Sequence, residues 1–249
     1  MSRWLFDLGN TRLKLAPLHA DGSLGAVHAI THGQVGLEQA LAPLLPARAQ
    51  SACVASVSSA DRTLALLQAL GSRFASISLA RSTASCAGVR NGYLEPGQLG
   101  VDRFLALLAA RQLGAGPWLV AGVGTALTVD LLDAHGRHRG GMIAPSPASM
   151  RMGLHQAATH LPLAGGQATG FADNTLDALA SGCEWAALGQ LQRSHARASQ
   201  LLGSEPGLLL HGGGAGGLAA SLPLARLVPD LVLLGLARWA RLGSSDPSL

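Results

Sequence analysis

Arg3-Trp4-Leu5-Phe6-Asp7-Leu8-Gly9-Asn10-Thr11-Arg12-Leu13-Lys14 is the stretch that decides the expected fold. It begins as an apolar strand, reaches an acid at Asp7, turns at Gly9-Asn10 and leaves as an alternating strand. Gly9 and Asn10 tolerate the positive φ of a tight hairpin. Such a turn aims backbone N–H groups, with the Asn10 and Thr11 side chains, at one point, which favours anion binding.

The acid before the turn restricts what the turn can bind. Asp7 would repel a phosphate unless a cation lay between them, so the stretch predicts a metal–nucleotide pair with Mg²⁺ at Asp7, directly or through water. An ordinary hairpin with a surface aspartate explains the same residues. The stretch alone does not decide between these two interpretations.

Composition excludes several classes of protein. The chain has 249 residues, of which 48% are hydrophobic and 13% charged, so we expect extensive buried surface and no general disorder. The net charge of +4 comes from scattered arginines, and Lys14 is the only lysine. Without a basic stripe or interleaved aromatic residues, nucleic acid is not an expected partner.

Two further features bear on location. The uncharged stretches 112–129 and 206–225 are interrupted by glycine and proline, so we expect no membrane span. The chain has three widely spaced cysteines and no Cys-x-x-Cys, which is typical of reduced thiols in a cytoplasmic protein: Cys53, Cys86 and Cys183.

Hydrophobic periodicity predicts the order βββαβαβ for the first third of the chain. The strands are expected at 4–7, 12–17, 24–30, 51–57 and 73–79, and the helices at 36–45 and 60–70. An irregular segment with the only tyrosine, Tyr93, precedes an apolar helix at 99–111 that opens with Gly100-x-Asp102-Arg103. Asp102 fits a helix cap or dipole partner, and a charged pair beside an apolar helix also fits the rim of a cleft.

The second half repeats this plan. Strands are expected at 118–121, 126–130 and 137–143, and the turn Gly124-Thr125 duplicates the first hairpin. Two such hairpins facing each other would hold a polyphosphate. The remaining expected elements are helices at 146–159, 174–202 (with a kink at Gly182 or Gly189 left open) and 231–241, and a strand at 207–211.

One alternative motif occurs near the end of the chain. Gly212, Gly214 and Gly217 match Gly-x-Gly-x-x-Gly after a strand, the pattern of a dinucleotide-dependent oxidoreductase. The match is weak because a run of glycine and alanine satisfies it trivially. The sequence contains no P-loop, no His-Glu-x-x-His zinc motif and no Gly-x-Ser-x-Gly elbow.

The remaining motifs occur together in a recognisable order: Asp7-x-Gly9-Asn10-Thr11-x-x-Lys14, Tyr93 with Gly100-x-Asp102-Arg103, Gly124-Thr125-Ala126-x-Thr128-x-Asp130, Gly140-Gly141-x-Ile143-x-Pro145, Thr175 before Ser181-Gly182, and Gly212-Gly213. In this order and spacing they resemble the type III pantothenate kinases, a family also labelled as Bvg accessory factors. The resemblance spans nearly the whole chain.

The resemblance implies an α/β protein of the actin/Hsp70/sugar kinase superfamily, with two ribonuclease-H-like domains, mixed sheets flanked by helices, and ATP in a central cleft. Domain 1–116 would carry the first phosphate hairpin and the pantothenate site. Domain 117–249 would carry the second phosphate hairpin, an adenosine loop and dimerisation helices. The implied reaction is ATP-dependent phosphorylation of pantothenate to 4′-phosphopantothenate, the first step of coenzyme A biosynthesis, by a homodimer whose substrate pocket is completed near the partner subunit.

The resemblance also implies a role for each matched residue. Asp102 would be the catalytic base, Asp7 would bind Mg²⁺, and Asp130 would bind a monovalent cation, K⁺ or NH₄⁺. The implied ATP-binding residues are Asp7, Leu8, Gly9, Asn10, Thr11, Arg12, Leu13, Lys14, Gly124 and Thr125. The implied pantothenate-binding residues are Tyr93, Gly100, Val101, Asp102, Arg103 and Thr175.

The chain departs from the family pattern at two places. Ser146 stands where a glycine usually follows the proline, and Gly213-Gly214-Ala215 lacks the acid of an expected Gly-Gly-Asp-Ala. Both departures put contacts with the nucleotide base in question more than the phosphoryl transfer step. A non-catalytic transcriptional accessory factor on the same fold is the other alternative, although the chain keeps Asp7, Asp102 and Asp130 together.

Overall fold

The computed structural model describes residues 2–33 and 36–242, which form two compact units. The first unit combines Met1–Gly114 with the segment that begins at Asp230, and the second is Ala115–Pro229. The division near residue 115 lies within two residues of the expected boundary. The last helix, however, packs in the first unit and not in the second domain to which the sequence analysis assigns it.

The first unit is built on a five-stranded mixed sheet with the order β3-β2-β1-β4-β5. Strands β1, β2 and β3 form an antiparallel meander, and β4 and β5 run parallel to β1. The strands are β1 (Arg3–Leu8), β2 (Arg12–Leu18), β3 (His28–Thr31), β4 (Ala49–Ser56) and β5 (Phe74–Leu79). All five predicted strands are present, but β3 begins four residues later than expected, because residues 19–25 form a hydrogen-bonded loop after β2.

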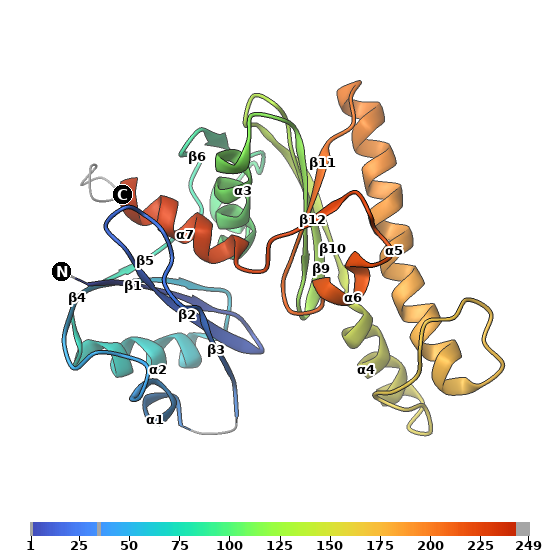
Figure 1. Cartoon of the computed structure of the whole chain (residues 1–249), viewed down its shortest axis with the longest axis horizontal. Helices are drawn as coiled ribbons and strands as arrows, with labels where there is room; N and C mark the ends of the chain where they lie inside the picture. Colours follow the sequence, from blue (N-terminus) through green and yellow to red (C-terminus); the bar gives the residue numbers. More distant parts are fainter. Residues whose placement is uncertain (1, 34–35, 243–249) are drawn as a thin grey trace. The chain divides into compact units, whose positions relative to one another are not determined.

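Helices cover both faces of this sheet. Figure 1 shows α1 (Leu37–Leu41) and α2 (Ala60–Gly71) on one side, and α3 (Val101–Leu113) and α7 (Leu231–Leu242) on the other. Alternate residues of β1 and β2, such as Phe6, Leu8 and Leu13, form a core with α1 and α2. Residues between them, including Asp7 and Lys14, therefore belong to the face of α3 and α7.

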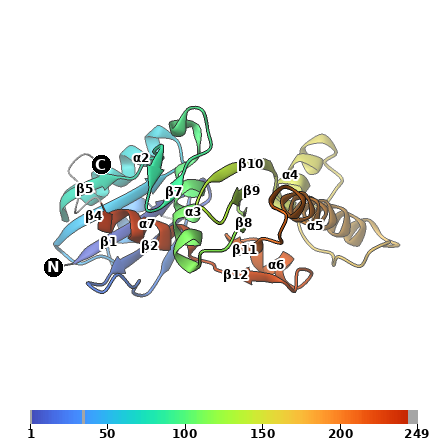
Figure 2. The ribbon, with the colours of Figure 1, turned by 90° about the horizontal axis from the view of Figure 1, so that it is seen from above.

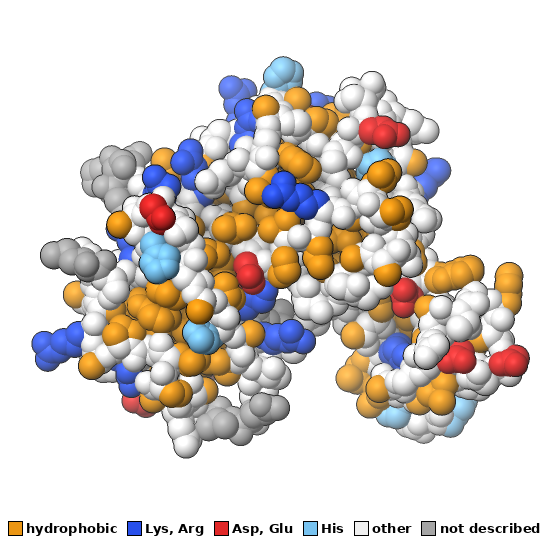
Figure 3. All heavy atoms as spheres, in the orientation of Figure 1, with side chains coloured by type: hydrophobic (Ala, Val, Ile, Leu, Met, Phe, Trp, Pro, Cys, Tyr) orange, Lys and Arg blue, Asp and Glu red, His pale blue; other side chains and the backbone are white. Residues whose placement is uncertain are grey.

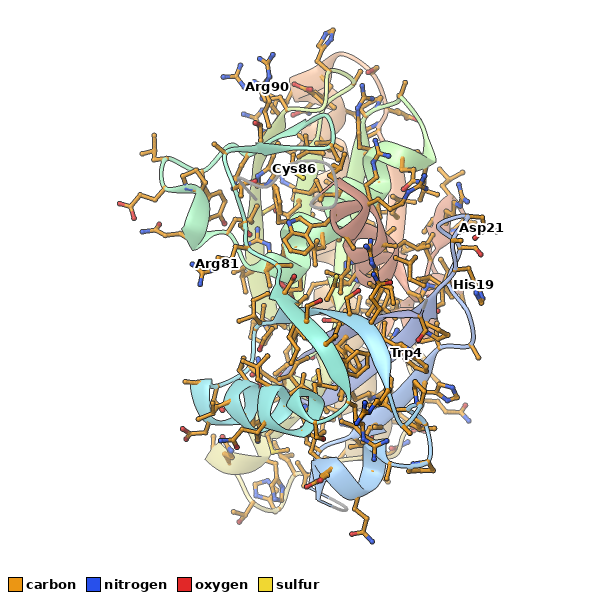
Figure 4. The ribbon with its side chains drawn as sticks, turned by 90° about the vertical axis from the view of Figure 1, so that its left-hand side faces the viewer. Trp4, His19, Asp21, Arg81, Cys86 and Arg90 are labelled. Atoms are coloured by element: carbon orange, nitrogen blue, oxygen red, sulfur yellow. The ribbon has the colours of Figure 1, made fainter. Side chains whose placement is uncertain are left out.

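A glycine sets how closely α3 and α7 approach each other. A Cβ at Gly235 of α7 would overlap the carbonyl of Leu105 of α3, so only glycine allows this spacing. The segment between β5 and α3 holds the short pair β6 (Ser85–Cys86) and β7 (Val89–Arg90) and the 3₁₀ turn Pro96–Gln98. Figure 4 shows Arg81, Cys86 and Arg90 along this segment, and Asp21 in the surface loop after β2.

The second unit repeats the strand order of the first, with β10-β9-β8-β11-β12. Strands β8 to β10 are antiparallel, and β11 and β12 run parallel to β8 (Figure 2). The strands are β8 (Trp118–Val123), β9 (Ala126–Leu132), β10 (His138–Pro145), β11 (Gly207–His211) and β12 (Ala225–Leu227). The expected duplication is thus confirmed at the level of topology, and β12, which has three residues, is the strand that the sequence analysis missed.

The helices of the second unit are α4 (Pro147–Ala157), α5 (Thr175–Leu202) and α6 (Ala215–Ala219). Helix α5 runs for 28 residues as one element, so neither Gly182 nor Gly189 ends it. Within the described ranges, no helix combines the length and apolar character that crossing a bilayer requires. Cys53, Cys86 and Cys183 are buried and form no disulfide.

Candidate active site

The turn of the β1–β2 hairpin is closed by its own backbone. The amide of Gly9 donates to the carbonyl of Arg12 at 3.0 Å, and a Cβ at Gly9 would lie 3.3 Å from that oxygen. Neither Gly9 nor Asn10 has a positive φ, so the expected left-handed geometry is wrong. Glycine is favoured here by the close approach of Arg12, and the exposed tip consists of Asn10 and Thr11.

Two basic side chains of the same unit form hydrogen bonds with the backbone carbonyl groups of this turn. His32 Nε2 lies 2.9 Å from the carbonyl oxygen of Gly9, and Arg62 Nη1 donates to the carbonyl of Asn10 at 2.9 Å. The amide of His32 also donates to the carbonyl of Thr11. Protein donors thus engage three carbonyl oxygens that would otherwise repel a phosphate. No local sequence pattern points to His32 or Arg62, because they lie 23 and 52 residues away from the carbonyl groups that their side chains contact.

Asp7 is the centre of a group of charged residues in the first unit. Burial, followed by the negative charges of Asp102 and Asp230, raises the pKa of Asp7 to about 7, although Lys14 acts to lower it. Lys14 is the register partner of Asp7 across the hairpin. A cation bound beside such a carboxylate would stabilise its negative charge, which burial and the neighbouring carboxylates disfavour.

Asp102 and Arg103 begin α3 at this group. The Asp102 Oδ1 accepts a 2.8 Å hydrogen bond from the amide of Arg103, and a Cβ at Gly100 would lie 2.8 Å from the same oxygen. Glycine at position 100 therefore leaves room for the carboxylate. Asp102 is the acidic residue of the first turn of α3, as a dipole partner would be, but α3 has no side-chain cap, so the cap interpretation is wrong. The charge of Asp102 also acts on Asp7.

Arg103 is buried and oriented by Tyr93. Its Nη1 donates to the Tyr93 hydroxyl at 3.0 Å, and its guanidinium carbon lies 5.8 Å from the centre of the tyrosine ring. Asn91 fixes this part of the chain, because its side chain accepts from the Tyr93 amide and donates to the carbonyls of Thr83 and Pro96. The guanidinium is thus preorganised, as binding of a carboxylate requires.

The turn of the second hairpin resembles the first. The amide of Gly124 donates to the carbonyl of Ala126 at 2.9 Å, and Gly124 and Thr125 are exposed. Ser149 Oγ of α4 donates to the carbonyl of Thr125 at 2.5 Å. Ser146, where the family pattern has glycine, caps α4 by accepting from the amide of Ser149.

Asp130 lies on β9 and is buried with His138 of β10. Their side chains are 2.8 Å apart, from His138 Nε2 to Asp130 Oδ1. This histidine contact was not expected from the sequence. Thr175 is the exposed first residue of α5, capped by Asn174.

Three implied binding residues have buried side chains. Leu8 and Leu13 belong to the hydrophobic core, and Val101 is buried at the start of α3. Only their backbone groups could face a ligand. Gly212 has a positive φ and Gly214 lies against Val123, so this glycine run allows close packing on the end of β8.

Among the described residues, no cluster of three or more histidine, cysteine, aspartate or glutamate side chains could hold a metal by itself. Mg²⁺ seldom uses an all-protein cage and is commonly held by one or two carboxylates with water and substrate phosphates, and Asp7 is a carboxylate of this kind. The chemistry of the Asp7 group therefore fits Mg²⁺ that arrives with a nucleotide.

Comparison with solved structures defines the class of protein. A structure from Campylobacter jejuni, described provisionally as a Baf family transcriptional activator, matches with a TM-score of 0.62 and 18% identity, over 99% of this chain and 100% of that one. A provisional N-acetylmannosamine kinase from Listeria monocytogenes matches with a TM-score of 0.53 and 14% identity, over 99% and 100%. The chain therefore has the fold of these two structures, an α/β fold with mixed sheets flanked by helices, as expected.

The chain belongs to the type III pantothenate kinase family. The model of that family matches residues 4–197. A type III pantothenate kinase of Stenotrophomonas maltophilia (strain R551-3) is 52% identical over 240 residues, covering 96% of this chain and 98% of the relative. Another, from Xanthomonas axonopodis pv. citri (strain 306), is 49% identical over 245 residues, covering 98% and 100%.

The raised pKa of Asp7 predicts an unusual pH dependence of stability. Because the pKa is about 7 in the folded state and near 3.8 in the unfolded state, the folded state binds more protons between these values. The contribution of Asp7 to the free energy of unfolding should therefore fall as pH rises from about 4 to 7. Urea unfolding between pH 5 and 8, without divalent cations, should show this loss in the wild type and not in Asp7→Asn.

The control is Asp61→Asn, which removes an exposed carboxylate from the first turn of α2. It should keep the wild-type pH dependence. Equal pH dependence in the wild type and Asp7→Asn would contradict a raised pKa at Asp7.

Proposed function

We propose that this protein transfers the γ-phosphoryl group of ATP to the primary alcohol of pantothenate, giving 4′-phosphopantothenate, as the first step of coenzyme A biosynthesis in the cytoplasm. The observation that carries the proposal is the grouping of Asp7, Asp102 and the Tyr93-bound Arg103 in one unit of a chain from this kinase family. The grouping supplies a cation position, a base and a carboxylate-binding guanidinium.

ATP is assigned to the two hairpins. Residues 7–14 present the first exposed turn, with its carbonyls held by His32 and Arg62, and Gly124-Thr125 present the second. Mg²⁺ at Asp7 would neutralise charge on the phosphates. Phosphoryl transfer depends mainly on positioning and charge neutralisation, and preformed turns and fixed charges supply both.

Pantothenate is assigned to the start of α3. Asp102 accepts or orients the proton of the alcohol, while Arg103, held by Tyr93, binds the carboxylate. The closeness of Gly100 to Asp102 keeps this end of the helix free of a side chain that would displace the base. Thr175 is assigned to the same substrate through the resemblance alone.

Asp102→Asn should lower kcat by about 10²–10⁴-fold, because an amide cannot accept the alcohol proton, while ATP still binds. A coupled ADP-release assay with and without pantothenate measures this, and nucleotide titration measures ATP binding. Near-normal turnover in the variant would remove Asp102 from the role of base. If the rate of ADP release by the wild type did not depend on pantothenate, the proposed reaction itself would be overturned.

Arg103→Ala should raise KM for pantothenate by about tenfold to a hundredfold, the loss expected for a charged hydrogen bond of about 1.5–3 kcal/mol. KM for ATP should change little. Arg103→Lys is the matched variant, since it keeps the charge and loses the planar fork. An unchanged KM for pantothenate in both variants would show that the carboxylate binds elsewhere.

A monovalent cation at Asp130 is part of the proposal. The buried Asp130 carboxylate supports it, because a negative charge removed from water favours a cation beside it. Replacing Na⁺ with K⁺ at constant ionic strength should raise the ADP-release rate in the wild type. Asp130→Asn should lose that response, and an equal rate in both salts would count against the site.

A homodimer is supported by apolar surface on the second unit. Helix α4 has no fully buried residue, and a hollow of about 540 Å³ lies between α4 and α5, lined by Met150, Leu154 and Leu179 among others. Leu154, Leu163 and Trp185 are 43–53% exposed, and Figure 3 shows hydrophobic side chains at the surface of this unit. A second copy would cover such a surface.

Sedimentation should therefore show a dimer for the wild type and a monomer for Leu154→Glu/Trp185→Glu. The two introduced glutamates would lose their hydration in a dimer contact at these positions. The free-energy cost of that desolvation would exceed the gain from burying the apolar surface. Leu64→Glu is the control, because Leu64 is 56% exposed on α2 of the other unit. A monomeric wild type, or a dimer that both variants leave intact, would contradict this assignment.

Neither alternative gains support from the structure. A dinucleotide site normally follows its glycine turn with a full crossover helix, whereas α6 has five residues. The likeness to a provisional transcriptional activator concerns the fold, at 18% identity.

A further inference from the structure

The single lysine of the chain forms an ion pair with the first residue of the returning segment. Lys14 Nζ lies 2.8 Å from Asp230 Oδ1, and the two side chains are 22% and 33% exposed. Asp230 directly precedes α7, whose Leu234 amide donates to the Asp230 carbonyl. A residue 216 positions away thus reaches the hairpin that is assigned to ATP.

The sheet register places this ion pair beside the proposed metal position. Lys14 on β2 pairs across the hairpin with Asp7 on β1, and neighbouring Leu13 and Leu15 point into the opposite core. Lys14 therefore extends along the face on which α7 packs. Asp230 belongs to the start of that helix, so its carboxylate meets the ammonium where the strand and the helix converge.

The charges around Lys14 explain why a fixed position matters. Asp102 and Asp230 both act on Asp7 with negative charge, and Lys14 acts on it with positive charge. A lysine side chain loses about 1.5–2 kcal/mol of conformational entropy when it is immobilised. An ion pair that forms before the nucleotide binds meets this entropy cost in advance.

We propose that Asp230 is a positioning residue of the kinase site, which holds the Lys14 ammonium beside Asp7 ready for the phosphates of ATP. The inference rests on the proposed function, in which residues 7–14 bind ATP. The competing explanation is that Asp230 serves only as the N-cap of α7. Asparagine separates the two, since it caps a helix about as well as aspartate but lacks the charge that Lys14 needs.

Asp230→Asn should raise KM for MgATP by about threefold to tenfold, with KM for pantothenate unchanged and kcat changed much less, in line with the modest strength of a partly exposed ion pair. In a Lys14→Met background the same substitution should add nothing, because the group that Asp230 positions is absent. Asp230→Glu should recover part of the lost affinity. Asp21→Asn, in the surface loop after β2, is the matched control for loss of one carboxylate (Figure 4).

A second measurement needs no kinase activity. Since Lys14 is the only lysine, an acylating reagent modifies one side-chain amine in the chain, and mass spectrometry follows its rate. Asp230→Asn should speed acylation of Lys14 several-fold over the wild type and over Asp21→Asn, since the amine loses its ion pair with Asp230. MgATP should slow acylation in the wild type.

The two measurements separate this inference from the proposed function. A wild type without pantothenate-dependent ADP release defeats the function, while the acylation rates still test the ion pair. Equal acylation of Lys14 in the wild type and Asp230→Asn overturns the pairing. An active enzyme whose KM for MgATP is the same in the wild type and Asp230→Asn, or a full additive effect of Asp230→Asn in the Lys14→Met background, overturns the positioning role.

Discussion

Helices cover both faces of the central strand of the first sheet, so a charged side chain on this strand must lie near the strand end, where the helices no longer cover it. Strand β1 has the core with α1 and α2 on one face and α3 and α7 on the other, so most of its residues must be apolar. Asp7 is the penultimate residue of β1, and burial together with nearby carboxylates raises its pKa to about 7. Lys14 stabilises its charge, and a cation bound with a nucleotide would do so more strongly.

Helix packing brings the remaining carboxylates to the same place. Gly235 lets α7 approach the carbonyl of Leu105 on α3. Leu105 lies about one turn after Asp102, and Gly235 about one turn after Asp230. The closest helix contact therefore fixes the separation of the two helix starts, and with it the negative charge around Asp7. A glycine with no role in the chemistry thus contributes to the electrostatics of the site.

Local sequence patterns predict the hairpins, the helices and the duplication, because alternation, glycine turns and apolar periodicity are local signals. The same patterns cannot show that α7 returns to the first unit, since its apolar faces would fit either sheet. Nor do they reveal Asp230, because an aspartate before an apolar helix is also what any N-cap looks like. Strand β12 is too short to show a period, and the predicted positive φ at Gly9 fails because close backbone approach also selects glycine.

The two hairpins share a backbone plan but differ in charge. Asp7 lies two residues before Gly9 and pairs with Lys14, whereas the corresponding residue of β8 is Gly122, which pairs with Thr128. A Cβ at Gly122 would lie 2.8 Å from Thr128 Oγ1 and 2.9 Å from His211 Nε2, so a side chain at this position would have to displace one of them. Mg²⁺ that is bound with a nucleotide needs only one or two protein carboxylates, so an acid in the first hairpin alone fits the proposed site. The duplication therefore repeats the turn, while the charged pair Asp7–Lys14 occurs in the first hairpin, which is the one proposed to bind the metal.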